Sequence, residues 1–295
     1  MKREITLTLI INLLFINNLY SYNNKNKCED YLSKDKPAEA INAAKSLTSK
    51  YDSNFCEAKA KYYQNDYAGA IESFEESIKH AELQADQMYA ILYKGIAQRD
   101  SNKIKASTKT FKYGLETAKI GNSKYMQMEQ KFLYQLGLSL TEMKDYFNAT
   151  DYLTKSLMIA ANDDERAESY NSLAVAHAAN KKFAKSVEFG LKAANTYQRS
   201  GHRGKYADAI FNLSNYHFLD GNSSKALSLL ENLERFARDN GSEYYQAKAL
   251  FEKSSLYLKL DKLSESDLSL KSAQSISIKI GATDLITAYE LNNEE

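Results

Sequence analysis

The chain has 295 residues, which is enough for one or two ordinary domains. Its 39 basic and 38 acidic residues leave a formal net charge of +1. No basic excess is available to attract phosphate backbones, so nucleic acid is not expected as a partner. The chain contains one Pro and 11 Gly, too few to supply the turns of a many-stranded β protein. The composition therefore predicts an all-α fold.

The first 21 residues differ from the rest of the chain. Lys2 and Arg3 precede an apolar run from Ile5 to Ile16, and polar residues follow. A basic start, roughly 7–15 apolar residues and a polar exit are typical of a secretory signal peptide, and the run is shorter than the roughly 18 residues of a membrane-spanning helix. We expect residues 1–21 to be a signal peptide and the protein to be exported (periplasmic or secreted). The alternative is a membrane anchor formed by an uncleaved N-terminal segment.

Two cysteines, Cys28 and Cys56, follow this segment. In an exported protein an even number of cysteines favours a disulfide. The alternative is two buried free thiols that pack as small hydrophobic side chains. No CxxC motif or Cys/His cluster occurs in the sequence, so neither a zinc site nor any other metal or cofactor is expected.

A two-helix pattern then recurs six times. In the third unit it reads Leu136-Gly137-x-x-Leu140 on the first helix and Ala149-x-x-x-Leu153 on the second. A small residue on the first helix lets the neighbouring helix approach closely. These small residues are Ala58, Gly95, Gly137, Ala174, Ser214 and Ser254, at spacings of 37, 42, 37, 40 and 40 residues. A recurrence of this kind predicts a helical-repeat architecture.

The pattern resembles the tetratricopeptide repeat, with L-G-x-x-Y on the first helix and A-x-x-x-F on the second. It covers roughly residues 30–291. The signature Trp and the turn Pro are absent, and the period exceeds the usual 34, as in the kinesin-light-chain-like subgroup with longer helices. The resemblance implies a right-handed α-α superhelical solenoid over residues 22–291. We expect a partial unit over 28–50, six units over about 51–280 and a capping helix over 283–291.

A second signal has nearly the same period. Gly121, Gly201, Gly241 and Gly281 lie on a grid of 40 residues, with Ala161 at the remaining position. Glycine just past a helix end readily takes the left-handed conformation that other residues resist. We therefore expect the second helix of most units to end at these glycines.

The resemblance also implies a binding surface, because the first helix of each unit lines a concave face in this fold. In each unit, the side chains at the positions three residues before, one residue after and four residues after the small residue are expected to face this concave surface. We expect a peptide or protein to bind there, against Leu92, Ile96, Tyr134, Leu138, Phe211, Asn215, Phe218, Phe251 and Leu258. The same offsets hold Phe55, Lys59, Tyr62, Arg99, Thr141, Asn171, Val175, Ala178 and Ser255. The alternative is that some of these side chains form additional core.

No catalytic constellation is evident. His177 and His217 share one repeat position, where the family usually carries Tyr. They are either a metal or proton-relay pair or two packing side chains, and no carboxylate or Cys at matching spacing completes a ligand set. Motifs for phosphate binding, serine hydrolysis or zinc proteolysis are absent from the sequence. The sequence therefore predicts a non-enzymatic scaffold. The alternative function is a sensory or regulatory input module that responds to a peptide or small ligand.

Overall fold

A computed structural model describes residues 27–293 of the chain, so the predicted signal peptide lies outside the described residues. After a helical stretch over residues 27–33, the helices of the first half are α2 (Pro37–Ala44), α3 (Lys50–Tyr63), α4 (Tyr67–His80), α5 (Gln84–Asp100), α6 (Ile104–Ile120), the 3-10 helix η1 (Asn122–Tyr125) and α7 (Met126–Glu142). The second half contains α8 (Tyr146–Met158), α9 (Asp163–Ala179), α10 (Phe183–Ser200), α11 (Arg203–Leu219), α12 (Ser223–Asp239), α13 (Glu243–Lys259), α14 (Leu263–Ile280) and α15 (Thr283–Asn293).

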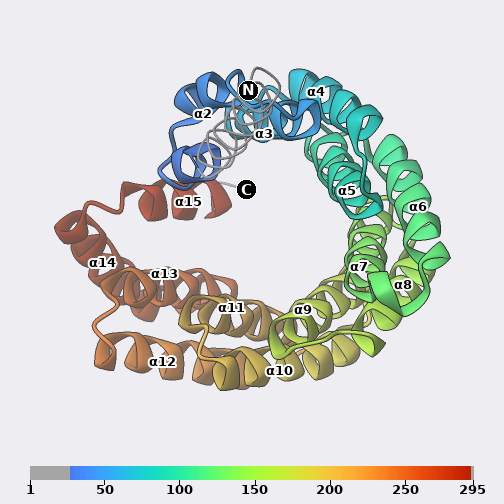
Figure 1. Ribbon diagram of the computed structural model, residues 1–295. Helices are drawn as coiled ribbons and strands as arrows, with labels where there is room; N and C mark the ends of the chain where they lie inside the picture. The colour runs from blue at the N-terminus through green and yellow to red at the C-terminus, as the bar shows by residue number, and fades with distance from the viewer. Residues whose placement is uncertain (1–26, 294–295) are drawn as a thin grey trace, which may run out of the picture. The chain divides into compact units, whose positions relative to one another are not determined.

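The predicted all-α fold is confirmed, because residues 27–293 contain helices and turns but no strand (Figure 1). The six expected helix pairs correspond to α3/α4, α5/α6, α7/α8, α9/α10, α11/α12 and α13/α14, and α15 covers the expected capping helix. None of the helices within residues 27–293 is both long and apolar enough to span a membrane.

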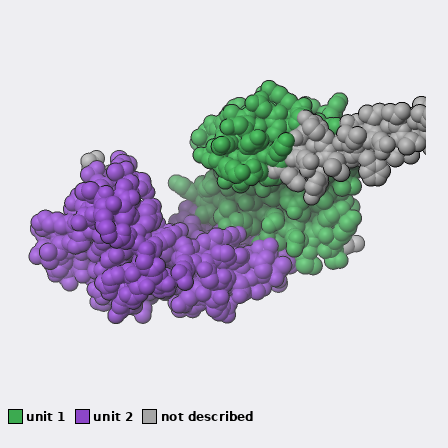
Figure 2. Space-filling model, turned by 60° about the vertical axis from the view of Figure 1, so that its left-hand side comes forward, with its two compact units in different colours: residues 1–145 green, residues 146–295 purple. Residues whose placement is uncertain are grey.

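The chain divides into two compact units, residues 1–145 and 146–295 (Figure 2). The sequence predicted one continuous solenoid, and the division falls between α7 and α8, inside the third expected pair. Within unit 2, α9, α11 and α13 form one layer and α10, α12 and α14 form the other (Figure 1). The last helix, α15, packs on both α13 and α14.

Local sequence explains why these segments are helical. The buried residues of α12 are Ala226, Leu230, Leu233 and Ala237, at the spacing of three or four residues that places them on one face. The starts of α3, α4 and α9 carry capping side chains. At α9, for example, the side chain of Asn162 accepts a hydrogen bond from the backbone N–H of Glu165 at 2.9 Å. Apolar spacing thus gives a helix such as α12 one face to bury, and a capping side chain fixes the start of α9.

The two helices of each pair that lies within one unit pack in the same register. The small residue of the first helix lies twelve residues before a small residue of the second, and all of these residues are buried. The pairs are Ala58 and Ala70, Gly95 and Ser107, Ala174 and Ser186, Ser214 and Ala226, and Ser254 and Ser266. In the α11/α12 pair the Ser214 hydroxyl donates a hydrogen bond to the carbonyl of Ala226 at 3.0 Å. The helix backbones therefore approach closely, as the small residues predicted.

The turn inside each pair also repeats. Seven residues after each small residue of the first helix, one residue has a positive φ: Asn65 (61°), Asn102 (62°), Lys144 (62°), Lys181 (55°), Gly221 (82°) and Asp261 (57°). The N–H of the following residue donates to the carbonyl five residues earlier, as Lys182 does to His177 at 2.8 Å. This is the Schellman arrangement, which satisfies carbonyls at the end of a helix. The sequence did not reveal it because only one of the six positions is Gly.

The predicted glycine ends are confirmed at three positions. Gly201, Gly241 and Gly281 have φ values of 76°, 69° and 71°. The prediction is wrong for Gly121, whose φ is −82°. There the chain continues directly into η1, and a Cβ on Gly121 would lie 2.1 Å from the Cδ2 atom of Tyr125. The close approach of this ring, rather than a left-handed conformation, requires glycine at position 121.

Candidate functional site

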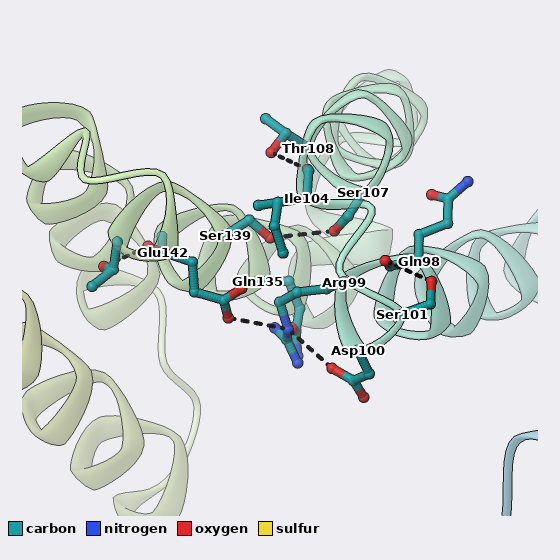
Figure 3. Close-up of polar contacts among 12 residues, drawn as sticks. Gln98, Arg99, Asp100, Ser101, Ile104, Ser107, Thr108, Gln135, Ser139 and Glu142 are labelled. Atoms are coloured by element: carbon teal, nitrogen blue, oxygen red, sulfur yellow. Dashed lines mark hydrogen bonds and ion pairs between the residues drawn. The ribbon is translucent and has the colours of Figure 1, made fainter. Parts of the chain in front are cut away.

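In unit 1 the polar side chains at the expected groove positions already have partners. Lys59 forms an ion pair with Glu29 at 2.7 Å, and the hydroxyl of Tyr62 donates to the carboxylate of Asp100. Arg99 extends from α5 towards α7, where it donates to the amide oxygen of Gln135 (Figure 3).

The Arg99 guanidinium is also 3.3 Å from Asp100 and 3.6 Å from Glu142. Only 14% of the Arg99 side chain is exposed. The apolar groove residues predicted in this unit are also largely covered, since Leu92 is 6% exposed and Ile96, Tyr134 and Leu138 are half-buried. Leu92 is therefore a core residue rather than part of an open binding surface, and α5 packs against α4, α6 and α7.

Unit 2 contains a cavity of about 410 Å³ between α11, α13 and α15. Its walls include Phe211 and Asn215 from α11, Phe251 and Glu252 from α13, and Tyr289 from α15. A second cavity of about 40 Å³ shares Phe211, Asn215 and Glu252 with the first. The two cavities therefore form one continuous depression, which we call the unit-2 groove.

The predicted groove residues of unit 2 differ in their exposure. Phe211 and Phe251 line the groove, but they are only 9% and 4% exposed and belong mainly to the core. Phe218 is half-buried and lines the smaller cavity. Asn215 is exposed and lines both cavities. Leu258 is 37% exposed and lines neither cavity. The hypothesis that all these side chains are open anchors is thus wrong for Phe211 and Phe251.

The last helix closes one end of the groove. The ring centroids of Tyr289 and Phe251 are 5.1 Å apart, and the hydroxyls of Tyr289 and Ser254 are 2.8 Å apart. Leu285, also on α15, contributes to the wall and to the small core that contains Phe251. The expected capping helix therefore supplies part of the candidate site, which the sequence did not indicate.

The charged side chains of the groove differ in whether they are paired. Lys248 forms an ion pair with Asp208 at 2.9 Å, and its Nζ lies 4.6 Å from the ring centroid of Phe211. By contrast, Asn215, Glu252 and Lys259 form no hydrogen bond or ion pair with any other residue in the described range 27–293. These three side chains are available to an incoming molecule.

Glu252 has a perturbed acidity. Its carboxyl group is open to solvent through the mouth of the groove, but protein surrounds it on the other sides. The loss of bulk water raises the pKa of Glu252, and the nearby charges of Lys248 and Lys259 partly oppose this shift. Glu252 and Lys259 could have been found from the sequence, because residues 248, 252, 255 and 259 share one face of a helix.

Of the two histidines at the shared repeat position, His177 is buried and His217 is half-buried, and the Nδ1 atom of each has no hydrogen-bond partner among residues 27–293. The imidazole of His177 is 8% exposed and stacks on the ring of Phe189, with centroids 5.4 Å apart. Burial lowers the pKa of both His177 and His217, which disfavours the charged form. The described residues contain no group of three or more His, Cys, Asp or Glu side chains that could hold a metal ion.

At the N-terminal end of unit 1, Cys28 and Cys56 form a disulfide with their Cα atoms 6.2 Å apart. Cys28 lies in the helical stretch 27–33 and Cys56 lies on α3. Both side chains are buried, together with Leu32, Ala40 and Ala44. The bridge therefore ties the partial unit to the first complete helix pair.

No protein-family model and no curated protein sequence matches the chain. Solved structures do resemble it. A tetratricopeptide repeat protein from Parabacteroides merdae is 13% identical, with a TM-score of 0.59 over 92% of this chain and 99% of that chain. The aspartyl phosphate phosphatase F of Bacillus subtilis is 14% identical, with a TM-score of 0.66 over 89% of this chain and 67% of that chain.

A kinesin light chain from Podosopora anserina contains TPR-like repeats that are nearly identical to one another. The structure of these repeats is 14% identical in sequence to this chain, with a TM-score of 0.60 over 69% of this chain and 100% of that chain. These identities are too low to transfer an activity, but TM-scores of 0.59 to 0.66 over 69–92% of this chain show a shared fold. The chain therefore has the helical-repeat fold of tetratricopeptide proteins.

Proposed function

We propose that this protein is a non-enzymatic repeat scaffold that binds a peptide, or an extended segment of another protein, in the unit-2 groove. The observation that carries the proposal is the combination of aromatic walls with unpaired polar side chains at one concave place. Ligand sites are typically apolar hollows with a few polar groups that fix orientation. Here the aromatic rings of Phe211, Phe251 and Tyr289 form the apolar part of the hollow. Asn215 and Glu252 are the polar groups that can orient a ligand.

The chemistry of Asn215 suits a peptide backbone. Its side-chain amide offers both a donor and an acceptor, and each peptide unit offers one of each. Since Asn215 has no hydrogen-bond partner among residues 27–293, a bound peptide would satisfy it without breaking an existing contact. Unit 1 is less suited to binding because Lys59, Tyr62 and Arg99 already have partners there.

An enzymatic function is less well supported. A carboxyl group with a raised pKa, such as Glu252, can serve as a general acid or base. Such chemistry usually needs a second group, yet the described lining of the larger cavity contains no other carboxylate and no His or Cys. Glu252 is therefore better suited to binding than to catalysis.

Export remains part of the proposal. The basic start and short apolar run of residues 1–21 support a secretory signal, and a disulfide between Cys28 and Cys56 suits an oxidising compartment. N-terminal sequencing of the protein from the extracytoplasmic fraction should find a chain that begins near Tyr22. A full-length chain confined to the cytosol would contradict export without affecting the groove.

Binding is tested with a displayed library of random octapeptides, selected on the immobilised protein. Selected peptides should bind in solution, as measured by fluorescence anisotropy. The Asn215→Trp variant should lose this binding because the larger side chain fills the groove, whereas Glu231→Trp, on the exposed face of α12, should retain it. Equal peptide binding by both variants would place the binding surface outside the groove and contradict the proposal.

A further inference from the structure

The charged residues of the unit-2 groove lie in order along α13. Lys248, Glu252 and Lys259 are separated by four and seven residues, so all three lie on the helix face that lines the groove. Lys248 is already held by Asp208 and by the ring of Phe211. Glu252 and Lys259 are therefore the negative and positive groups of this face that remain unpaired among the described residues.

Each of these two groups favours a ligand group of opposite charge. A partly desolvated carboxylate without a donor is costly, and a charged donor compensates it better than a neutral one. Glu252 thus suits an ammonium or guanidinium group. The Nζ of Lys259 lies 5.7 Å from the ring centroid of Phe218, at the edge of the smaller cavity, and it suits a carboxylate.

The spacing of residues 252 and 259 along α13 gives an approximate length for the ligand. Seven residues of α-helix advance about 10.5 Å along the axis. An extended peptide advances about 3.3 Å per residue, so about three residues cover the same distance. The ligand would also pass Asn215, which lines the groove from α11.

We infer that the unit-2 groove is specific for an extended peptide segment with a basic group seated on Glu252 and a carboxylate seated on Lys259, about three residues apart. An apolar side chain of the same segment lies against Phe211 and Phe251. The carboxylate belongs to an acidic side chain or to the C-terminus of the peptide. This inference rests on the proposed function, because it assigns the charge pattern of the ligand that the groove binds.

The experiment is a selection of random octapeptides on the wild-type protein and on charge variants. Peptides selected on the wild type should combine a basic residue and a carboxylate two to four positions apart. Their affinity should fall roughly 10- to 100-fold for Glu252→Gln and for Lys259→Gln, as expected when a charged hydrogen bond is lost. Glu231→Gln, an exposed change on α12, serves as the matched control and should leave affinity unchanged.

A double variant, Glu252→Lys with Lys259→Glu, gives the sharpest result. It keeps the net charge and should select peptides in which the basic residue and the carboxylate have exchanged positions. Thermal melts should show that each variant folds like the wild type, since residues 252 and 259 are exposed.

Failure of the charge assignment and failure of the groove give different results. If peptides bind the wild type but carry no charge pattern, or if the double variant selects the same pattern as the wild type, the inference is overturned and the groove remains a binding site. If no peptide binds the wild type better than it binds Asn215→Trp, both the inference and the proposed function are overturned.

Discussion

The ring of Phe111 occupies the place where a side chain on Gly95 would begin, because a Cβ on Gly95 would lie 2.3 Å from the Cε1 atom of Phe111. Phe111 is fully buried and cannot swing away. We expect Gly95→Ala to destabilise the protein by about 1–3 kcal/mol through overpacking, as measured by urea unfolding. Phe111→Leu should make room, so Gly95→Ala should cost less in that background. Equal costs in both backgrounds would contradict the packing explanation.

The repeated turn predicts a stabilising substitution. Lys181 has a φ of 55° and occupies the same place in its helix pair as Gly221 in the next. A left-handed conformation costs a non-glycine residue about 1–2 kcal/mol, and the greater unfolded-state freedom of glycine offsets about 0.5–1 kcal/mol of this. Lys181→Gly should therefore raise the free energy of unfolding by about 0.5–1 kcal/mol.

Two comparisons test this explanation of the turn. Gly221→Ala should destabilise the protein, although no atom lies within 4 Å of the added Cβ, because only the backbone conformation opposes it. Lys185→Gly, inside α10, should also destabilise, by about 1 kcal/mol. A loss of stability in Lys181→Gly similar to that in Lys185→Gly would show that the left-handed turn is not the cause.

Phe251 and Leu258 should respond differently to truncation. Phe251 is 4% exposed and stacks on Tyr289, so Phe251→Ala should cost roughly 3–5 kcal/mol of folding stability. Leu258 is 37% exposed and lies outside the groove, so Leu258→Ala should cost under about 1 kcal/mol and leave peptide affinity unchanged. Denaturant unfolding and anisotropy titrations of both variants measure this. A stable Phe251→Ala protein would mean that the ring is a surface anchor after all.

The N-terminal disulfide should contribute measurably to stability. The bridge between Cys28 and Cys56 closes a loop with a sequence separation of 28 residues. A chain-entropy account gives about 3–4 kcal/mol for such a loop. The double variant Cys28→Ser/Cys56→Ser should lose about this amount, and a reductant should lower the melting temperature of the wild type but not of the variant. Peptide mapping without reductant checks the linkage directly, and two free thiols in the exported protein would refute it.

The buried His177 and the half-buried His217 predict a pH dependence of stability. Burial, together with Lys185 and Lys182, lowers the pKa of His177 in the folded state, with a smaller opposing effect of Glu188. Burial and Lys225 similarly lower the pKa of His217, and Asp220 opposes this. An unfolded histidine titrates near pH 6.5, so below that pH the unfolded state binds more protons than the folded state. Stability should therefore be fully present above about pH 6.5 and decline as the pH falls below it.

Replacing the titrating rings should flatten this decline. His177→Phe/His217→Phe should unfold in urea with a smaller stability difference between about pH 7.5 and 5.5 than the wild type shows. Each single variant should account for part of the effect. An identical pH profile for the wild type and the double variant would show that other groups control the decline.

The helix pairs could be predicted from the sequence because their packing depends on local, repeated features. Small residues such as Ala58 and Gly95 mark the close contact between the two helices of a pair, and they are buried as expected. The turns were missed because Asn, Lys and Asp occupy five of the six left-handed positions, where the Schellman hydrogen bonds stabilise a backbone that residue type alone does not reveal.

The candidate site could be predicted only in part. The repeat offsets led to Phe211, Asn215 and Phe218, which do line the groove. The offsets omitted Glu252 because they select three positions of each first helix. The groove is lined by further positions of α13, and Glu252 is one of them. Whether a side chain at these positions is open or buried depends on how the neighbouring helices pack, and Leu92 is buried although its offset is the same as that of a groove residue.

The constant register within a helix pair also predicts where the chain can accept inserted residues and where it cannot. One residue added between Ser214 and Ala226 would rotate Ala226 by about 100° and remove it from the contact with the first helix. Residues added in the connection after Gly121, where η1 already lengthens the chain, would leave every small residue opposite its partner. Connections of this kind are natural positions for an epitope tag or a fused domain, because they lengthen the repeat without changing its packing.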